Sequence, residues 1–285
     1  MHQLKLTLTF PWTYWGALLR GLFIIVPFVI CFAHPEDTLG REKTFPFSPG
    51  EKLTFQARWG PIPAAVGVLE VLPIETVNGI KSRHFTLTIK TYPYIDPFYK
   101  VRDRIDSFTD VDMTHSILYK KLKKGKSRKN VVVNFFWDKK KARYIKNGKT
   151  RRTISILPGS FDPLSVFYAF RLRKLKENLE MEGPVTDGKK CVIGKVKVIK
   201  REKITIASGT YDTYLVEPDL KHLGGVFEKT KNAKLHIWVT ADEKQIPIMV
   251  KSEVVVGSFV GELVSLEQIP VAGPKDARLL RADRH

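Results

Sequence analysis

The chain has little cysteine for its length. Two cysteines occur in 285 residues, Cys31 and Cys191, and Cys31 lies in an apolar N-terminal segment. If that segment is removed, no internal disulfide can form, so stability must come from a packed core. Cys191 begins a run of alternating residues, and we interpret it as an ordinary strand residue rather than a nucleophile.

The common catalytic signatures are also missing. The sequence has no G-x-S-x-G elbow, no P-loop, no G-x-G-x-x-G after a strand and no H-E-x-x-H. His236 is the one histidine firmly on a predicted strand, and it shares a side with Trp238, which favours a half-buried pair over a metal ligand. We therefore predict no catalytic residue, no metal ligand and no cofactor.

A hydrolase remains a minor alternative, because acidic residues are concentrated between Asp103 and Asp112. Asp103 and Asp106 fall on opposite faces of a predicted strand, each beside basic neighbours, which favours simple ion pairs. A hydrolase would need such acids, or His236, to converge in a cleft.

No apolar run is long enough to span a membrane comfortably. The run Leu22 to Phe32 has 11 residues and contains a proline, and Lys5 and Arg20 are the only charges in the first 33 residues. The small residue Ala33 makes an acceptable cleavage site. We expect residues 1–33 to be a secretory signal peptide or an uncleaved N-terminal anchor, and the protein to be exported to the periplasm or envelope.

Strand patterns dominate the rest of the chain. Glu51 to Trp59 alternates apolar and polar residues, and Asn78-Gly79 and Asn147-Gly148 are strong type I′ hairpin signals. Asn178 to Gly188 is a polar, acidic stretch that we expect to be a loop. We expect a lead-in at 34–49, a single β domain at 50–268 and a loose tail at 269–285.

One helix is predicted, from Asp162 to Lys176. Asp162 is a good N-cap, Pro163 suits the first turn, and basic residues follow at the C-terminal end. The first half of this helix is apolar nearly all round, so it must be enclosed. We therefore predict a mainly β fold: an antiparallel half-barrel or open barrel of about ten to twelve strands with the helix on its concave side.

Positive charge is concentrated in one window. Residues 120–152 contain 15 Lys or Arg and one acid, Asp138, and so hold most of the chain's formal net charge of +19. We expect these cations at hairpin ends, on one rim of the sheet. They favour an anionic partner about as well as a solvated surface that blocks edge pairing.

Several scattered segments together resemble a known family. They are Gly50-Glu51 leading into Trp59-Gly60, Phe161-Asp162-Pro163-Leu164-Ser165 with Phe167-Tyr168 and Arg171, Ser208-Gly209-Thr210, Trp238 with Asp242 and Pro247, and Gly257-Ser258. Their order and spacing, from about Phe47 to Leu266, resemble bacterial exported proteins of the domain of unknown function 3108 family. The resemblance implies an envelope-located antiparallel β fold, similar in style to periplasmic lipoprotein and lipid carriers, without an established activity. The dense basic window departs from the family pattern.

The leading functional prediction is a carrier for an anionic amphiphile, such as a phospholipid, a lipopolysaccharide fragment or an acylated protein. Four helix residues would line or gate an apolar cavity: Leu164, Phe167, Tyr168 and Phe170. Seven cations would hold the headgroup: Lys120, Lys121, Lys123, Lys124, Lys126, Arg128 and Lys129. Nucleic acid is not expected, because no aromatic residue is interleaved among these cations. We expect a monomer, and an assembly module that binds another envelope protein is the alternative.

Overall fold

The computed structural model describes residues 44–125, 128–219, 234–254 and 257–271. All of them belong to one compact unit that begins at Lys43. The predicted signal peptide, most of the lead-in, Lys126, the segment Lys221 to Asn232 and most of the tail lie outside the described residues.

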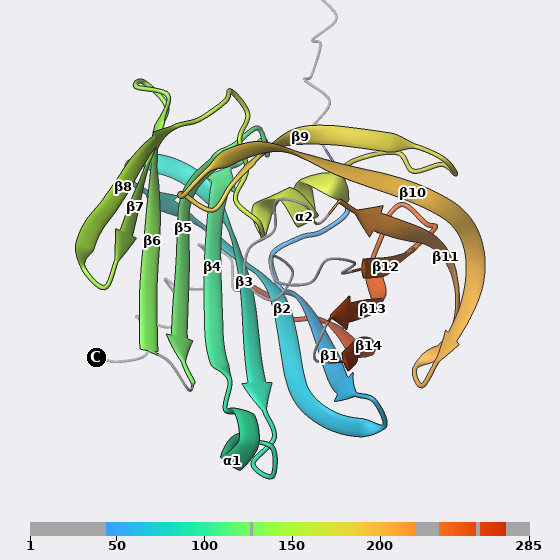
Figure 1. Cartoon of the computed structure of the whole chain (residues 1–285). Coiled ribbons are helices and arrows are strands. Elements are labelled where there is room, and N and C mark those ends of the chain that lie inside the picture. The colour runs from blue at the N-terminus through green and yellow to red at the C-terminus, as the bar shows by residue number, and fades with distance from the viewer. Residues whose placement is uncertain (1–43, 126–127, 220–233, 255–256, 272–285) are drawn as a thin grey trace, which may run out of the picture. The chain divides into compact units, whose positions relative to one another are not determined.

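A single antiparallel sheet of fourteen strands forms the described part of the chain (Figure 1). The strands are β1 (Glu51–Trp59), β2 (Ile62–Val77), β3 (Ile80–Thr91), β4 (Arg102–Asp110), β5 (Ser116–Lys124), β6 (Arg128–Phe136), β7 (Lys141–Lys146), β8 (Lys149–Ser155), β9 (Glu180–Thr186), β10 (Cys191–Ile206), β11 (Gly209–Pro218), β12 (Lys234–Thr240), β13 (Pro247–Val254) and β14 (Gly257–Gln268). Their order is β8-β7-β6-β5-β4-β3-β2-β1-β14-β13-β12-β11-β10-β9. The first and last strands of the chain therefore pair in the middle of the sheet, which leaves β8 and β9 at its edges.

The predicted fold class is confirmed, but the strand number is wrong. The sheet has fourteen strands instead of ten to twelve, because β5, β7 and β8 occupy much of the basic window and β9 occupies the expected acidic loop. In β8 nearly every side chain is exposed, so the strand lacks an apolar face that would mark it in the sequence. Both Asn-Gly turns are confirmed, since Asn78, Gly79, Asn147 and Gly148 all have positive φ between 50° and 79°.

The described residues contain two short helices, α1 (Asp96–Tyr99) and α2 (Ser165–Phe170). The predicted helix is thus much shorter than Asp162 to Lys176. It ends early because tertiary contacts hold the following backbone: the Arg173 carbonyl accepts a hydrogen bond from Gln245 (2.6 Å), and Leu175 is buried against Val198 and Val216. No helix in the described part of the chain is both long and apolar enough to cross a membrane.

The sheet curls around α2, as Figure 1 shows. Its inner face carries Val71 and Phe85, which pack with Leu164 and Tyr168 of α2 in one buried cluster. A second cluster on the same face lies over β5 to β7 and includes Val131, Val133 and Tyr144. The core therefore lies between the sheet and what it encloses.

The two edges of the sheet approach each other without forming a continuous ladder. The segment between β8 and α2 bridges them: Phe161 pairs with Val185 of β9, and the Ser160 carbonyl accepts a hydrogen bond from the Ser116 backbone at the start of β5. The Arg152 guanidinium of β8 also donates to the Lys189 carbonyl (2.9 Å). The barrel is thus open, because β8 and β9 do not pair, and the gap between them is crossed by side chains and by the segment between β8 and α2.

Candidate functional site

Asp162 fixes the start of α2 through buried hydrogen bonds. Its carboxylate accepts from the backbone N–H groups of Leu164 (2.9 Å) and Ser165 (3.0 Å) and so satisfies donors at the start of α2, although the N-cap position itself is Leu164 and not Asp162. It also accepts from the hydroxyls of Ser107, Ser116 and Ser165, and Asp162 and all three serines are fully buried. This cluster is closed to solvent, so it positions the helix and cannot reach a substrate.

Arg171 fixes the other end of α2. Its guanidinium forms a two-pronged ion pair with Glu51 of β1, at 2.6 and 3.0 Å, and donates to the Lys244 carbonyl at 3.0 and 3.2 Å. Arg171 is 1% exposed and Glu51 is 6% exposed. Glu51 and Arg171, which both carried the family resemblance and lie 120 positions apart, are therefore partners in one buried contact.

The four helix residues predicted to line a cavity have different environments. Leu164 and Tyr168 are buried in the core with Phe47 and Phe85, and the Tyr168 ring stacks on Phe85 at a centroid distance of 4.0 Å. Phe167 and Phe170 are half-buried, although their helix face was expected to be enclosed. A ligand can therefore reach Phe167 and Phe170 more readily than the other two residues.

The predicted cation cluster is divided by the pleat of the sheet. Lys121 lies opposite Ile105 and Val131, and both of these residues belong to inner-face clusters. Lys123 and Lys129 are opposite each other on the same face. Lys120, Lys124 and Arg128 alternate to the outer face, where the Lys120 ammonium lies over the Phe108 ring at 5.5 Å. Lys120 and Lys121 therefore lie on opposite faces of β5, because neighbouring residues on a strand face opposite sides. Lys123, Lys124, Arg128 and Lys129 nevertheless lie together around the end of the β5–β6 hairpin.

A further lysine joins the inner face from the β9–β10 turn. Gly188 of this turn packs so closely on β6 and β7 that an added Cβ would lie 2.7 Å from a methyl group of Val133. The next residue, Lys189, pairs with Asp187 at 2.9 Å and lies 5.9 Å from the centre of the Tyr144 ring. We call Lys121, Lys123, Lys129 and Lys189 the inner lysines.

The inner lysines are incompletely neutralised. Lys123 pairs with Asp103 (3.3 Å), but within the described ranges neither Lys121 nor Lys129 has a carboxylate within ion-pair distance. Burial lowers the pKa of Lys121, and the charge of Lys123 lowers it further. Burial also lowers the pKa of Lys129, with the charges of Lys189 and Lys123 acting in the same direction. The cluster thus holds more positive charge than its surroundings compensate.

An open groove adjoins the inner lysines where β5 ends and β6 begins. It has a volume of about 750 Å³. Its lining is Lys100, Arg102, Leu122, Lys123, Lys124, Arg128, Lys129, Asn130 and Asn147, in which six of nine residues are cations and none is acidic. Arg102 and Lys123 are paired with Asp96 and Asp103, respectively. The groove therefore offers an anion access to Lys123 and Lys129 from solvent.

The acidic residues considered for hydrolysis have structural partners instead. Asp103 pairs with Lys123, while Asp106, on the other face, accepts from His84 (3.0 Å) and Arg104 (2.7 Å). His236 pairs with Glu217 at 2.8 Å. The acids and the histidine do not converge, and the part of the chain that the structure describes has no group of three residues that could hold a metal.

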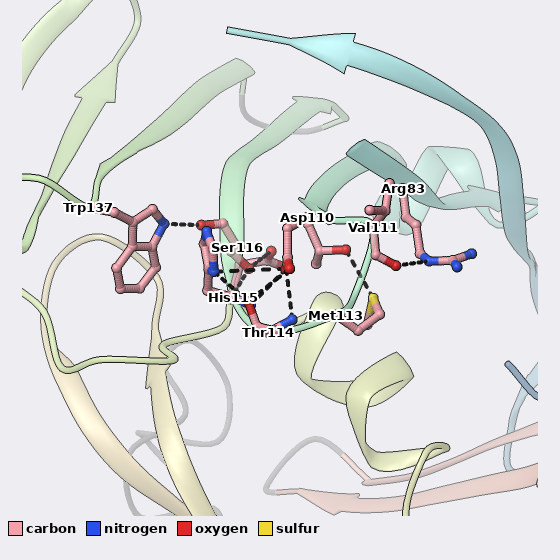
Figure 2. A network of polar contacts seen from close by, with 10 residues as sticks. Arg83, Asp110, Val111, Met113, Thr114, His115, Ser116 and Trp137 are labelled. Carbon is pink, nitrogen blue, oxygen red and sulfur yellow. Dashed lines mark hydrogen bonds and ion pairs between the residues drawn. The ribbon is translucent and has the colours of Figure 1, made fainter. Parts of the chain in front are cut away.

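Asp110 organises the turn between β4 and β5. Figure 2 shows its carboxylate accepting from the backbone N–H groups of Thr114 (2.7 Å) and His115 (3.0 Å) and from the Thr114 hydroxyl (2.8 Å). The Trp137 indole donates to the Ser116 carbonyl (2.9 Å) at the start of β5. These bonds fix where β5 starts, and with it the strand that carries Lys121 and Lys123.

Lys189 is the site residue that the sequence prediction missed. It directly follows the expected loop Asn178 to Gly188, but Asp187-Gly188 is a hairpin signal, and Gly188 has φ of 83°. This dipeptide could have predicted a turn between two strands. The position of this turn over β6 depends on the curl of the sheet, which the local sequence does not encode.

Comparison with solved structures gives distant similarities. A beta-barrel-like protein of domain of unknown function DUF1849 from Brucella abortus is 10% identical, covers 78% of this chain and 98% of its own, and has a TM-score of 0.49. A structure from Parabacteroides distasonis is 12% identical with coverages of 78% and 97% and a TM-score of 0.31. Similarity at this level carries no information on function. No curated protein matches the chain.

The family comparison covers most of the chain. The family described as "Protein of unknown function (DUF3108)" matches residues 54–264, a range that contains α2 and every strand except the beginning of β1 and the end of β14. Apart from Gly50-Glu51, the segments on which the sequence resemblance rested lie in this range, among them Asp162 and Arg171, which hold α2 in place. The chain belongs to the DUF3108 family.

Proposed function

We propose that this protein is an exported binding or carrier protein for an anionic amphiphile, whose charged group is held by the inner lysines. The observation that carries the proposal is the pair Lys121 and Lys129, which lie on a partly buried face without a carboxylate in ion-pair distance among the described residues. Like charges in a partly desolvated place raise the free energy of the unliganded protein. A bound anion would remove this penalty.

The surroundings of the lysines favour an amphiphile over a small, fully hydrated anion. Lys121 lies opposite the apolar residues Ile105 and Val131 on the neighbouring strands, and the groove that reaches Lys123 and Lys129 is open to solvent. Phe167 and Phe170 of α2 are half-buried and are the predicted lining residues that remain accessible. A phosphate or carboxylate headgroup would contact the lysines while an acyl chain covers apolar surface. Export is supported by the apolar segment before Ala33.

A titration with a soluble short-chain lipid tests this proposal. Dihexanoylphosphatidylglycerol, below its micelle concentration, should bind the full chain, and Lys121→Gln/Lys129→Gln should weaken binding by about tenfold or more. Lys139→Gln/Lys141→Gln removes the same charge from exposed positions around the β6–β7 turn and should leave the affinity within about twofold. An equal loss of affinity in both double variants would mean that binding depends only on the net charge of the protein, and the proposed site would be rejected.

Stability and pH provide two further readouts on the same variants. The pKa of Lys121 in the folded state is lower than its ordinary value of 10.5. Charged Lys121 therefore destabilises the unliganded fold at pH values below the lowered pKa, and this destabilisation disappears as the pH rises from the lowered pKa to 10.5. Lys121→Met should therefore raise the free energy of unfolding at pH 7 by about 0.5–1 kcal/mol while weakening binding. Binding by the parent should weaken as the pH rises toward the lowered lysine pKa. A Lys121→Met protein that is less stable than the parent would contradict this electrostatic account.

A further inference from the structure

Large exposed aromatic side chains gather at one end of the sheet. Phe98 and Tyr99 of α1 are 80% and 61% exposed, and Tyr94, just before α1, is 54% exposed. The register places the β1–β2 turn at the same end: Trp59, which is 49% exposed, lies opposite Ile62 in β2 and Phe259 in β14. Figure 1 shows α1 and the β1–β2 turn at this common end. We call Trp59, Ile62, Tyr94, Phe98, Tyr99 and Phe259 the aromatic end.

The backbone that carries α1 is held firmly, so the exposure of its rings is built into the fold. Asp96 pairs with Arg102 (2.6 Å) and accepts from the Thr91 hydroxyl (2.5 Å), and the backbone N–H of Val101 donates to the same hydroxyl (3.0 Å). Pro93 and Pro97 restrict the segment further. The polar groups of the loop point into this network while Phe98 and Tyr99 are left in solvent.

Exposed cations adjoin the aromatic end. Lys100 follows α1 directly, and Lys124 and Arg128 lie opposite each other where β5 ends and β6 begins. The β5 end packs against α1's C-terminal side, since an added Cβ at Gly125 would overlap the Lys100 carbonyl oxygen. In the described part of the chain, none of these three cations has a carboxylate within ion-pair distance. Aromatic rings and uncompensated positive charge therefore occur on one end of the molecule.

We propose that the aromatic end docks onto the surface of an anionic lipid bilayer. Tyr, Trp and Phe at the tips of separate turns fit the headgroup region, where an amphipathic ring is stable with one side apolar and the other wet. Lysine and arginine beside them are attracted to acidic headgroups, and their long stems can follow the rings into the interface. A protein partner is favoured less, because the rings project from several turn tips and do not line one groove.

The cations of this docking surface also line the groove that leads to Lys123 and Lys129, but the docking does not depend on the proposed function. The aromatic end would hold the molecule against a bilayer, whereas the inner lysines would bind one headgroup. The two proposals therefore predict opposite patterns in two assays, one with vesicles and one with a soluble short-chain lipid.

Co-sedimentation with vesicles tests the docking surface. The full chain should bind vesicles of phosphatidylcholine that contain phosphatidylglycerol, and Phe98→Ser/Tyr99→Ser should weaken this binding by about tenfold. Lys100→Gln/Lys124→Gln/Arg128→Gln should weaken it on the same vesicles and reduce its dependence on salt. The aromatic variant should bind dihexanoylphosphatidylglycerol like the parent, and Lys121→Gln/Lys129→Gln should still bind vesicles.

Ile74→Ser/Ile80→Ser is the matched control. These isoleucines are exposed at the opposite end of the β2–β3 hairpin, so the variant loses apolar surface of a similar kind elsewhere. Binding by the control should stay within about twofold of the parent. Vesicle binding that survives Phe98→Ser/Tyr99→Ser, or that falls equally in the control, would overturn the proposal. The proposal would also be overturned if the parent did not bind vesicles but bound a protein partner that Phe98→Ser/Tyr99→Ser does not bind.

Discussion

Arg171 carries a deeply buried charge, and its role is to hold elements together. Its guanidinium contacts Glu51 of β1 and the Lys244 carbonyl between β12 and β13, while its backbone directly follows α2. Three elements far apart in the chain therefore share one side chain. Removal of one member of a buried pair leaves the other charge uncompensated, which destabilises the fold more than loss of the pair as a whole.

We expect Arg171→Met to lower the free energy of unfolding by about 3–5 kcal/mol. The double variant Arg171→Met/Glu51→Met should recover most of that loss, because no unpaired charge is then buried. Urea unfolding at neutral pH measures both effects.

The exposed pair Arg201–Asp212 serves as the control, since its geometry is also two-pronged but solvent screens it. Arg201→Met should leave the unfolding midpoint close to that of the parent. A double variant as unstable as Arg171→Met would show that the shape of the arginine, and not its charge, is what the core requires.

At the scale of elements, the position of the β9–β10 turn decides whether the inner lysines form a cluster. The turn reaches β6 only because Gly188 has no side chain at the point where it touches Val133 and Tyr144. Its φ of 83° is also a conformation that other residues adopt with strain. Gly79 has nearly the same φ, 79°, and no neighbour within 4 Å of an added Cβ.

These two glycines separate backbone strain from steric contact. We expect Gly79→Ala to lower the free energy of unfolding by about 1 kcal/mol through strain alone. Gly188→Ala should lower it by about 2–4 kcal/mol, because strain and overpacking against a buried valine add.

Only the second substitution should also weaken binding of the soluble lipid, by moving Lys189. Thermal unfolding and the titration described above measure the two effects. Equal effects of the two substitutions on stability and binding would mean that the turn yields without displacing the lysine.

At the scale of the whole molecule, the strongly basic chain gains still more positive charge in acid, so carboxylates held in their charged form matter for its stability. Burial raises the pKa of Asp106, but hydrogen bonds from His84 and Arg104 outweigh burial and hold this pKa at about 2. The stability that Asp106 contributes is therefore complete above its ordinary value of 3.8 and is lost as the pH falls through about 2.

We expect Asp106→Asn to be less stable than the parent at pH 7 by about 1–2 kcal/mol, and the difference to vanish below pH 2. Urea unfolding between pH 7 and pH 2 measures this. Asp138→Asn, which neutralises an exposed carboxylate after β6, is the control and should show a smaller change over the same range. If Asp106→Asn stays less stable than the parent by the same amount down to pH 2, the shape of Asp106 and not its charge stabilises the fold.

The fold class and most of the strands could be predicted from the sequence. Alternation predicted β1 with its observed bounds, and the Asn-Gly turns formed with the expected positive φ, because these signals depend on neighbours in the chain. The hydrogen bonds that Asp162 accepts at the start of the helix could also be predicted, since capping acts over three residues.

The end of α2, the strands in the basic window and the composition of the lysine cluster depend on tertiary contacts and could not be predicted from the sequence. The helix stops at Phe170 because Gln245 and the core around Leu175 hold the next residues, and none of these contacts is local. The pleat of β5 sends Lys121 inward and Lys120 outward, and the curl of the sheet brings Lys189 to join Lys121. Periodicity encodes which residues share a face of one element, whereas contacts between distant strands depend on how the sheet closes.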